Sequence, residues 1–102
     1  MSPQSVPQGT VEIPEIEIKD QVSLDPTKTA VIVVDMQNDF VKPDGALLVE
    51  DASKTIPQIQ ALLADAREQG MHIAYTQDSQ VRNDPEFEHF PEHCRIGTWG
   101  WE

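Results

Sequence analysis

The sequence contains a single cysteine, Cys94, and therefore cannot form an internal disulfide. Small secreted domains usually depend on several disulfides, so this composition favours a protein of the reducing cytoplasm. Residues 1–10 lack the basic and apolar regions of a signal peptide. The longest apolar run, residues 30–34, is too short to cross a bilayer.

Basic residues are also scarce, because 7 Lys and Arg stand against 18 Asp and Glu, a formal net charge of −11. A field of this sign repels nucleic-acid backbones and anionic lipid head groups. We therefore expect neither nucleic acid nor a membrane surface as a partner. With 102 residues, the chain has the length of one domain or of part of one.

The first 27 residues divide into two segments. Residues 1–10 are rich in Pro and Ser without hydrophobic periodicity, which is typical of a flexible leader. Residues 11–27 form an arm in which apolar and acidic residues alternate from Val11 to Ile18, the pattern of a half-buried extended segment. Because Pro14 limits this segment to a sheet edge or an irregular path, we expect an arm that packs on the domain surface.

A strand–helix–strand unit follows. The β-branched run at residues 30–34 predicts a strand buried on both faces, and residues 36–50 predict a loop. Residues 53–69 predict a helix that ends at Gly70, and residues 72–76 a second, parallel strand. The apolar face of the helix has helical spacing and consists of Ile56, Ile59, Leu62, Leu63 and Ala66.

One such unit cannot cover both faces of its own sheet, and residues 77–102 contain no convincing helix or strand. We therefore expect an α/β fold: the first half of a doubly wound, Rossmann-like parallel sheet with three layers, αβα, whose second half is missing. The final segment is then either a functional loop or the start of a missing continuation.

Two carboxylates lie where ligands bind in open parallel sheets, beyond the carboxyl ends of the strands. Asp35 follows the first predicted strand and Asp78 the second, with Asp39 slightly further on. A partly desolvated carboxylate at such a place can exchange protons with a thiol or a leaving group. It can equally well accept hydrogen bonds from loop amides, and the spacing does not decide between these roles.

Asp78, His89 and His93 are candidate ligands for a divalent metal, although solvated loop residues are the simpler interpretation. Pro91 lies between the two histidines and removes the argument that they share a helical face. Cys94 adjoins His93, but neighbours in a loop usually point apart, so we expect an inert thiol and no nucleophile in this chain.

Three segments resemble, in order, the isochorismatase-like cysteine hydrolases, a family that includes nicotinamidases. The first is Val33-Val34-Asp35-Met36-Gln37-Asn38-Asp39-Phe40, and the second is Ala74-Tyr75-Thr76-Gln77-Asp78. The third comprises Asp84-Pro85-Glu86-Phe87, Pro91-Glu92-His93-Cys94 and Gly97-Thr98-Trp99-Gly100. The resemblance covers residues 28–102, which we interpret as the N-terminal part of such a hydrolase domain.

The resemblance implies a catalytic triad of aspartate, lysine and cysteine, in which the cysteine attacks an amide carbonyl. Asp35 matches the triad aspartate, which is thought to take up the thiol proton. The lysine and the cysteine follow later in the family sequences, beyond the part that this chain resembles. Cys94 does not match the nucleophile position.

Some nicotinamidases of the family bind a metal through the aspartate after the second strand and three downstream histidines. Asp78, His89 and His93 match plausible positions, but Gln80 stands where the first histidine is expected. An amide oxygen is a weak ligand for transition metals. The resemblance therefore implies no required cofactor, while a zinc-like divalent metal stays open.

The sequence thus predicts the N-terminal portion of a hydrolase that cleaves a C–N bond of a small amide. The alternatives are a non-catalytic binding or oligomer-partner module and one half of a split enzyme. As partners we expect the small substrate, and either further copies of the chain or a complementary C-terminal half.

Overall fold

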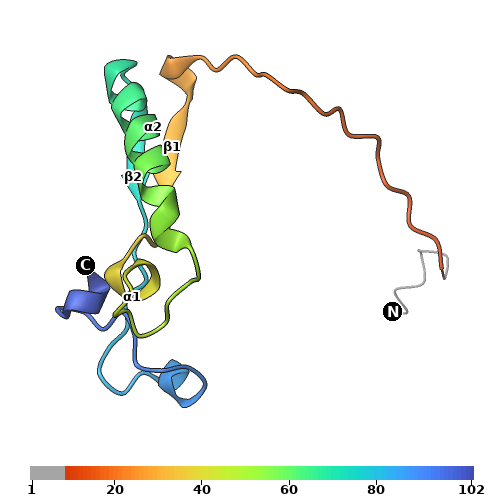
Figure 1. Ribbon diagram of the computed structural model, residues 1–102. Coiled ribbons are helices and arrows are strands. Elements are labelled where there is room, and N and C mark those ends of the chain that lie inside the picture. Colours follow the sequence, from red (N-terminus) through yellow and green to blue (C-terminus); the bar gives the residue numbers. More distant parts are fainter. Residues whose placement is uncertain (1–8) are drawn as a thin grey trace.

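The computed structural model describes residues 9–102 and contains a parallel sheet of two strands connected through a helix (Figure 1). Strand β1 (Ala30–Val33) pairs with strand β2 (His72–Tyr75), with Ala30 opposite His72 and Val33 opposite Tyr75. Helix α2 (Ile56–Glu68) lies along the sheet. The α/β class and the parallel strand–helix–strand unit are confirmed.

Helix α2 forms where the apolar periodicity predicts it. The short 3-10 helix η2 (Ala52–Thr55) precedes it, and Pro57 lies in the first turn, where its missing N–H costs nothing. Leu63 and Ala66 are buried, whereas Leu62 stays 53% exposed. The helix ends at Glu68, and Gly70 follows it with a φ of +72°, a left-handed conformation that glycine adopts without strain.

The prediction of a plain loop at residues 36–50 is wrong. Residues Asn38–Val41 form the one-turn helix α1, which packs against the 3-10 helix η4 (Trp99–Trp101). Asn38 explains this contact, because its backbone N–H donates to Glu102 O at 2.8 Å and its side-chain amide to Trp99 O at 2.8 Å. Hydrogen bonds to residues about sixty positions away therefore stabilise α1, whose own sequence has no helical periodicity.

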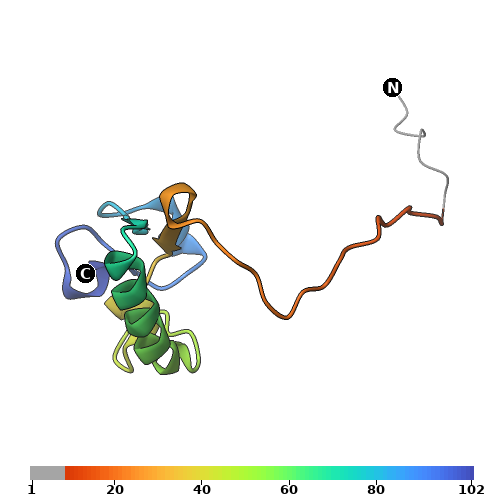
Figure 2. The same ribbon diagram turned by 90° about the horizontal axis from the view of Figure 1, so that it is seen from above.

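The arm does not pack on the domain surface, which corrects the sequence-based expectation. Its apolar side chains remain exposed, from Val11 at 78% to Ile18 at 90%. Figures 1 and 2 both show the arm running away from the strands and helices. An alternating pattern specifies an extended segment but not the surface that receives it. The predicted leader, residues 1–10, lies almost entirely outside the described residues.

The two strands are also more exposed than their composition predicts. Ile32 is 60% exposed and Tyr75 is 61% exposed, because α2 is the only long helix that residues 9–102 place against the sheet. In the part of the chain that the structure describes, both outer edges of this two-stranded sheet are unpaired. The described residues therefore do not provide the second covering layer that the apolar composition of the strands predicts.

The C-terminal segment has little regular structure, as expected. It contains two 3-10 helices, η3 (Pro85–Glu88) and η4, and Gln80 and Arg95 close a loop between them by an isolated parallel bridge. Another 3-10 turn, η1 (Pro26–Lys28), precedes β1. Within residues 9–102 no helix is both long and apolar enough to cross a membrane.

We predict that the isolated chain is marginally stable or self-associates. Open edges of a β-branched strand pair readily with other chains, and the exposed apolar residues of the sheet favour the same outcome. Size-exclusion chromatography with light scattering should show species larger than a monomer or a broad thermal transition. A compact monomer that unfolds cooperatively would contradict this prediction.

Candidate active site at the carboxyl ends of the strands

Asp35 lies directly beyond β1 and is held by Thr76, which follows β2. The Thr76 hydroxyl donates to Asp35 Oδ1 at 2.7 Å, and the Asp35 backbone N–H lies 3.1 Å from Thr76 Oγ1. The φ of Asp35 is +52°, a conformation that costs a non-glycine residue energy and is found at functional sites. The local structure thus fixes the Asp35 carboxylate at the carboxyl end of the sheet.

Gln37 extends the pairing of the strands beyond their ends. Its side chain is buried, accepts from the Asp78 backbone N–H at 2.8 Å and donates to Asp78 O at 2.8 Å. The same amide nitrogen also donates to Trp101 O. Trp101 in turn donates from its indole N–H to Ser79 Oγ at 2.9 Å, so this tryptophan anchors the segment. One glutamine thereby ties together both strand ends and the C-terminal turn.

Asp39 joins α1 to the loop that carries Cys94. Its carboxylate accepts from the Cys94 backbone N–H at 2.8 Å and from the Ala46 N–H at 3.0 Å. Gly100 packs so closely on this carboxylate that a Cβ at this position would overlap it. A glycine is therefore required where η4 passes over the buried Asp39.

We predict that Gly100→Ala destabilises the chain by about 3 kcal/mol. The new methyl group displaces the Asp39 carboxylate from two backbone N–H groups, and hydrogen bonds to charged groups contribute about 1.5–3 kcal/mol each. Gly97→Ala is the matched control, because its Cβ meets nothing within 4 Å and only its φ of +84° opposes the change. Urea titrations followed by tryptophan fluorescence should show the larger loss at Gly100; equal losses would contradict the prediction.

Cys94 is fully buried, and its Sγ faces Gly100 O at 3.9 Å. Burial raises the pKa of the thiol to about 12, and the negative charges of Asp78, Asp39, Asp35 and Glu86 act in the same direction. The thiolate is the nucleophilic form of cysteine. This environment therefore supports the expectation of an inert thiol.

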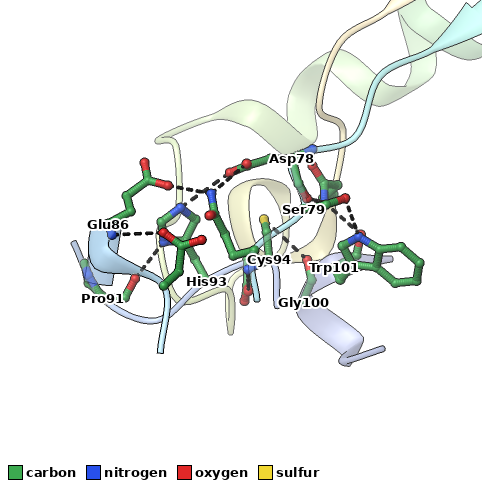
Figure 3. Close-up of polar contacts among 12 residues, drawn as sticks. Asp78, Ser79, Glu86, Pro91, His93, Cys94, Gly100 and Trp101 are labelled. Atoms are coloured by element: carbon green, nitrogen blue, oxygen red, sulfur yellow. Dashed lines mark hydrogen bonds and ion pairs between the residues drawn. The ribbon is translucent and has the colours of Figure 1, made fainter. Parts of the chain in front are cut away.

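A second group of side chains lies further along the C-terminal segment. Asp78, Glu86 and His93 offer ligand atoms that all lie within 4.8 Å of one another, and Figure 3 shows the three side chains converging. His93 Nε2 is 3.4 Å from Asp78 Oδ2, and His93 Nδ1 forms a hydrogen bond with Pro91 O at 2.6 Å. This donor set allows a divalent metal. His89 is exposed at the end of η3 and does not belong to the group.

Gln80 occupies the centre of this group. Its side-chain nitrogen donates to Asp78 Oδ1 at 2.8 Å and also to Glu86 Oε2. Within residues 9–102, every buried side-chain nitrogen and oxygen has a hydrogen-bond partner. The set of Asp78, Glu86 and His93 allows a metal, but the Gln80 amide engages two of the carboxylate oxygens that would bind it, so the residues fit a resident metal poorly.

Sequence reasoning brought together Asp78 and His93 but missed Glu86, Gln37 and Thr76. Glu86 joins the group because Asp84 accepts from its backbone N–H at 3.0 Å and starts the turn η3. The signal was present, since Asp-Pro at residues 84–85 is a typical start of such a turn. Gln37 and Thr76 act through long-range hydrogen bonds that have no local sequence signature.

A pocket of about 260 Å³ opens at the carboxyl ends of the strands. Its lining includes Val33, Tyr75 and Thr76, the residue whose hydroxyl holds the Asp35 carboxylate. This is the place where open parallel sheets bind ligands. A small ligand here would lie beside the hydrogen-bonded pair of Asp35 and Thr76.

Comparison with known proteins agrees with this geometry. The sequence model of the isochorismatase domain matches residues 29–102. Ureidoacrylate amidohydrolase RutB of Caulobacter segnis is 42% identical over 62 residues, which are 56% of this chain and 26% of that protein. The chain therefore spans about a quarter of the length of this curated relative.

Two solved structures share the fold. The pyrazinamidase of Pyrococcus horikoshii in complex with zinc has a TM-score of 0.68 and 39% identity, over 72% of this chain and 42% of that one. The nicotinamidase PncA of Bacillus subtilis has a TM-score of 0.64 and 35% identity, over 72% and 41%. Since the domain match covers most of the sequence, this chain belongs to the isochorismatase family, whose matched members are hydrolases of small amides.

Proposed function

We propose that this chain supplies the first part of a cysteine hydrolase that cleaves a C–N bond of a small amide. The observation that supports this most directly is the position of Asp35, whose carboxylate is fixed by Thr76 at the carboxyl end of β1. The family, the fold and the names of the amidohydrolase relatives support the reaction class.

In the proposed mechanism, Asp35 acts as the general base. It accepts the proton of a cysteine thiol, and the resulting thiolate attacks the amide carbonyl of the substrate. Ammonia or an amine leaves with a proton, and water then hydrolyses the thioester. The lysine and the nucleophilic cysteine lie outside these 102 residues in this proposal, because Cys94 is buried and holds its proton too firmly.

The proposed reaction requires no metal. A carboxylate base and a thiol supply the chemistry, and the group around Gln80 lies on a separate part of the C-terminal segment. We place the complete protein in the cytoplasm, because the cysteine of this segment is a free thiol. Its expected partners are a small amide and either further copies of the chain or a complementary C-terminal half.

Two alternatives give this chain a role other than the first part of a longer hydrolase chain. The chain could act as a non-catalytic binding or oligomer-partner module, or it could form half of a split enzyme. The exposed faces of β1 and β2 favour a role that includes another polypeptide. The DNA beyond the codon for Glu102 distinguishes these cases, because an open frame with the family lysine and cysteine supports a longer enzyme.

The proposal is tested by assaying the chain alone and as part of a longer polypeptide. We expect no hydrolysis of nicotinamide or simple amides by the 102 residues alone, because the covalent route has no nucleophile. Fusion to the C-terminal half of a family member should restore activity that iodoacetamide abolishes. Turnover by the chain alone, lost on alkylating Cys94, would overturn the proposal.

A further inference from the structure

We propose that the side-chain amide of Gln80 takes the place of a metal ion between Asp78 and Glu86, so that hydrogen bonds alone hold this group together. The inference concerns metal uptake by the chain itself and does not depend on the proposed amide hydrolysis. It makes Gln80 the residue that determines whether this site accepts a cation.

The argument begins with two carboxylates that converge on one nitrogen. Gln80 Nε2 lies 2.8 Å from Asp78 Oδ1 and within hydrogen-bond distance of Glu86 Oε2. Two neighbouring carboxylates repel each other unless a proton, a cation or hydrogen-bond donors lie between them. A primary amide carries two N–H donors, one for each carboxylate. Gln80 therefore supplies what a metal ion would otherwise supply.

The other side of Asp78 is also engaged. His93 Nδ1 donates to the Pro91 carbonyl, which can only accept, and the other ring nitrogen, Nε2, lies 3.4 Å from Asp78 Oδ2. Phe87 and Phe90 pack edge-on against the imidazole and help to fix its orientation. Asp78 Oδ1 thus accepts from Gln80 while Oδ2 faces the imidazole, and Gln80 and His93 are themselves buried.

A cation could enter only by breaking the bonds of Gln80. The amide would have to leave the two carboxylates or turn its oxygen inward, and an amide oxygen is a weak ligand for a transition metal. An ion at this place would therefore compete with Gln80 for Asp78 Oδ1 and Glu86 Oε2, the two carboxylate oxygens that the amide already engages. We conclude that the native group excludes zinc-like ions.

The first test is a calorimetric titration of the 102-residue chain, freed of metal by a chelator, with zinc chloride. We expect no saturable one-to-one uptake. The side-chain amide resonance of Gln80 in nitrogen–proton correlation spectra should also stay unchanged as zinc is added, with slow exchange of its hydrogen-bonded protons. Stoichiometric uptake, or a shift of this resonance in step with zinc, would overturn the proposal.

The second test replaces the donor by an isosteric acceptor. Gln80→Glu removes both N–H donors and brings three carboxylates and one imidazole together, which should favour a cation. We expect saturable one-to-one zinc uptake by Gln80→Glu, at least about 10-fold tighter than any zinc binding by the parent chain, the lower end of the range over which residues around a metal site change affinity. Zinc should also raise the thermal midpoint of Gln80→Glu and leave that of the parent chain unchanged.

Gln69→Glu is the matched control, because it adds the same charge at an exposed position after α2. Its zinc affinity should equal that of the parent chain. Equal zinc affinity for Gln80→Glu and Gln69→Glu would overturn the proposal. If Gln80→Glu does not fold, the zinc titration of the parent chain and the response of the Gln80 amide resonance still test the proposal.

Discussion

Replacement of Asp35 by Asn in a complete enzyme that contains this segment should lower kcat/KM by about 10²–10⁴, the usual contribution of a general base. Asn keeps the shape of the side chain and can still accept the Thr76 hydroxyl through its oxygen, but it cannot take a proton from the thiol. The measurement is steady-state kinetics on the best amide substrate, with circular dichroism to confirm folding.

Two substitutions serve as controls for Asp35→Asn. Asp65→Asn makes the same change on the exposed side of α2 and should leave kcat/KM unchanged. Cys94→Ser should also have little effect on kcat/KM, because a serine hydroxyl can donate to the same acceptor, Gly100 O. A silent Asp35→Asn beside an inactive Cys94→Ser would mean that the nucleophile has been assigned to the wrong half of the fold.

Thr76→Val should reveal whether the orientation of Asp35 matters for the rate. Valine has nearly the shape of threonine but leaves Asp35 Oδ1 without its 2.7 Å donor. We expect kcat to fall with little change in KM, and Thr76→Ser to restore most of the rate because the hydroxyl returns. Equal losses in Thr76→Val and Thr76→Ser would assign Thr76 a packing role instead.

The fold was predictable where the hydrophobic pattern has a period. The β-branched run before Asp35 specifies β1, and the stripe that includes Leu63 and Ala66 specifies α2. The helix α1 escaped prediction because its four residues are held by the distant residues of η4. The path of the arm was not predicted either, since Ile18 and its apolar neighbours stay largely exposed among residues 9–102.

The site was predictable only in part. Asp35 and Asp78 follow from a general rule about the ends of parallel strands. The roles of Glu86 and Gln80 do not follow from this rule. These residues lie close to His93 because of the turn η3 and the β-bridge between Gln80 and Arg95. The family resemblance offered His89 as a possible ligand, but the conformation of the loop brings Glu86 to the group instead.

Cys94 should react with iodoacetamide about 10³ times more slowly in the native chain than in the urea-unfolded chain at pH 8. An ordinary thiol with a pKa of about 8.5 is roughly one quarter ionised at this pH, whereas a pKa of about 12 leaves about one molecule in 10⁴ ionised. Complete burial of the side chain slows the reaction further. Mass spectrometry of timed, quenched samples gives both rates.

The same pKa shift predicts how stability changes with pH. Above about pH 8.5 the unfolded chain loses the thiol proton while the folded chain keeps it, so the folded state binds more protons and the free energy of unfolding falls as pH rises. Cys94→Ser should remove this decline, because serine does not ionise in that range. Gly100→Ala should instead accelerate native labelling, since it disturbs the Asp39 contact that holds the Cys94 backbone. Native labelling as fast as that of the unfolded chain would show that the thiol is accessible and ionised, and would make Cys94 a candidate nucleophile after all.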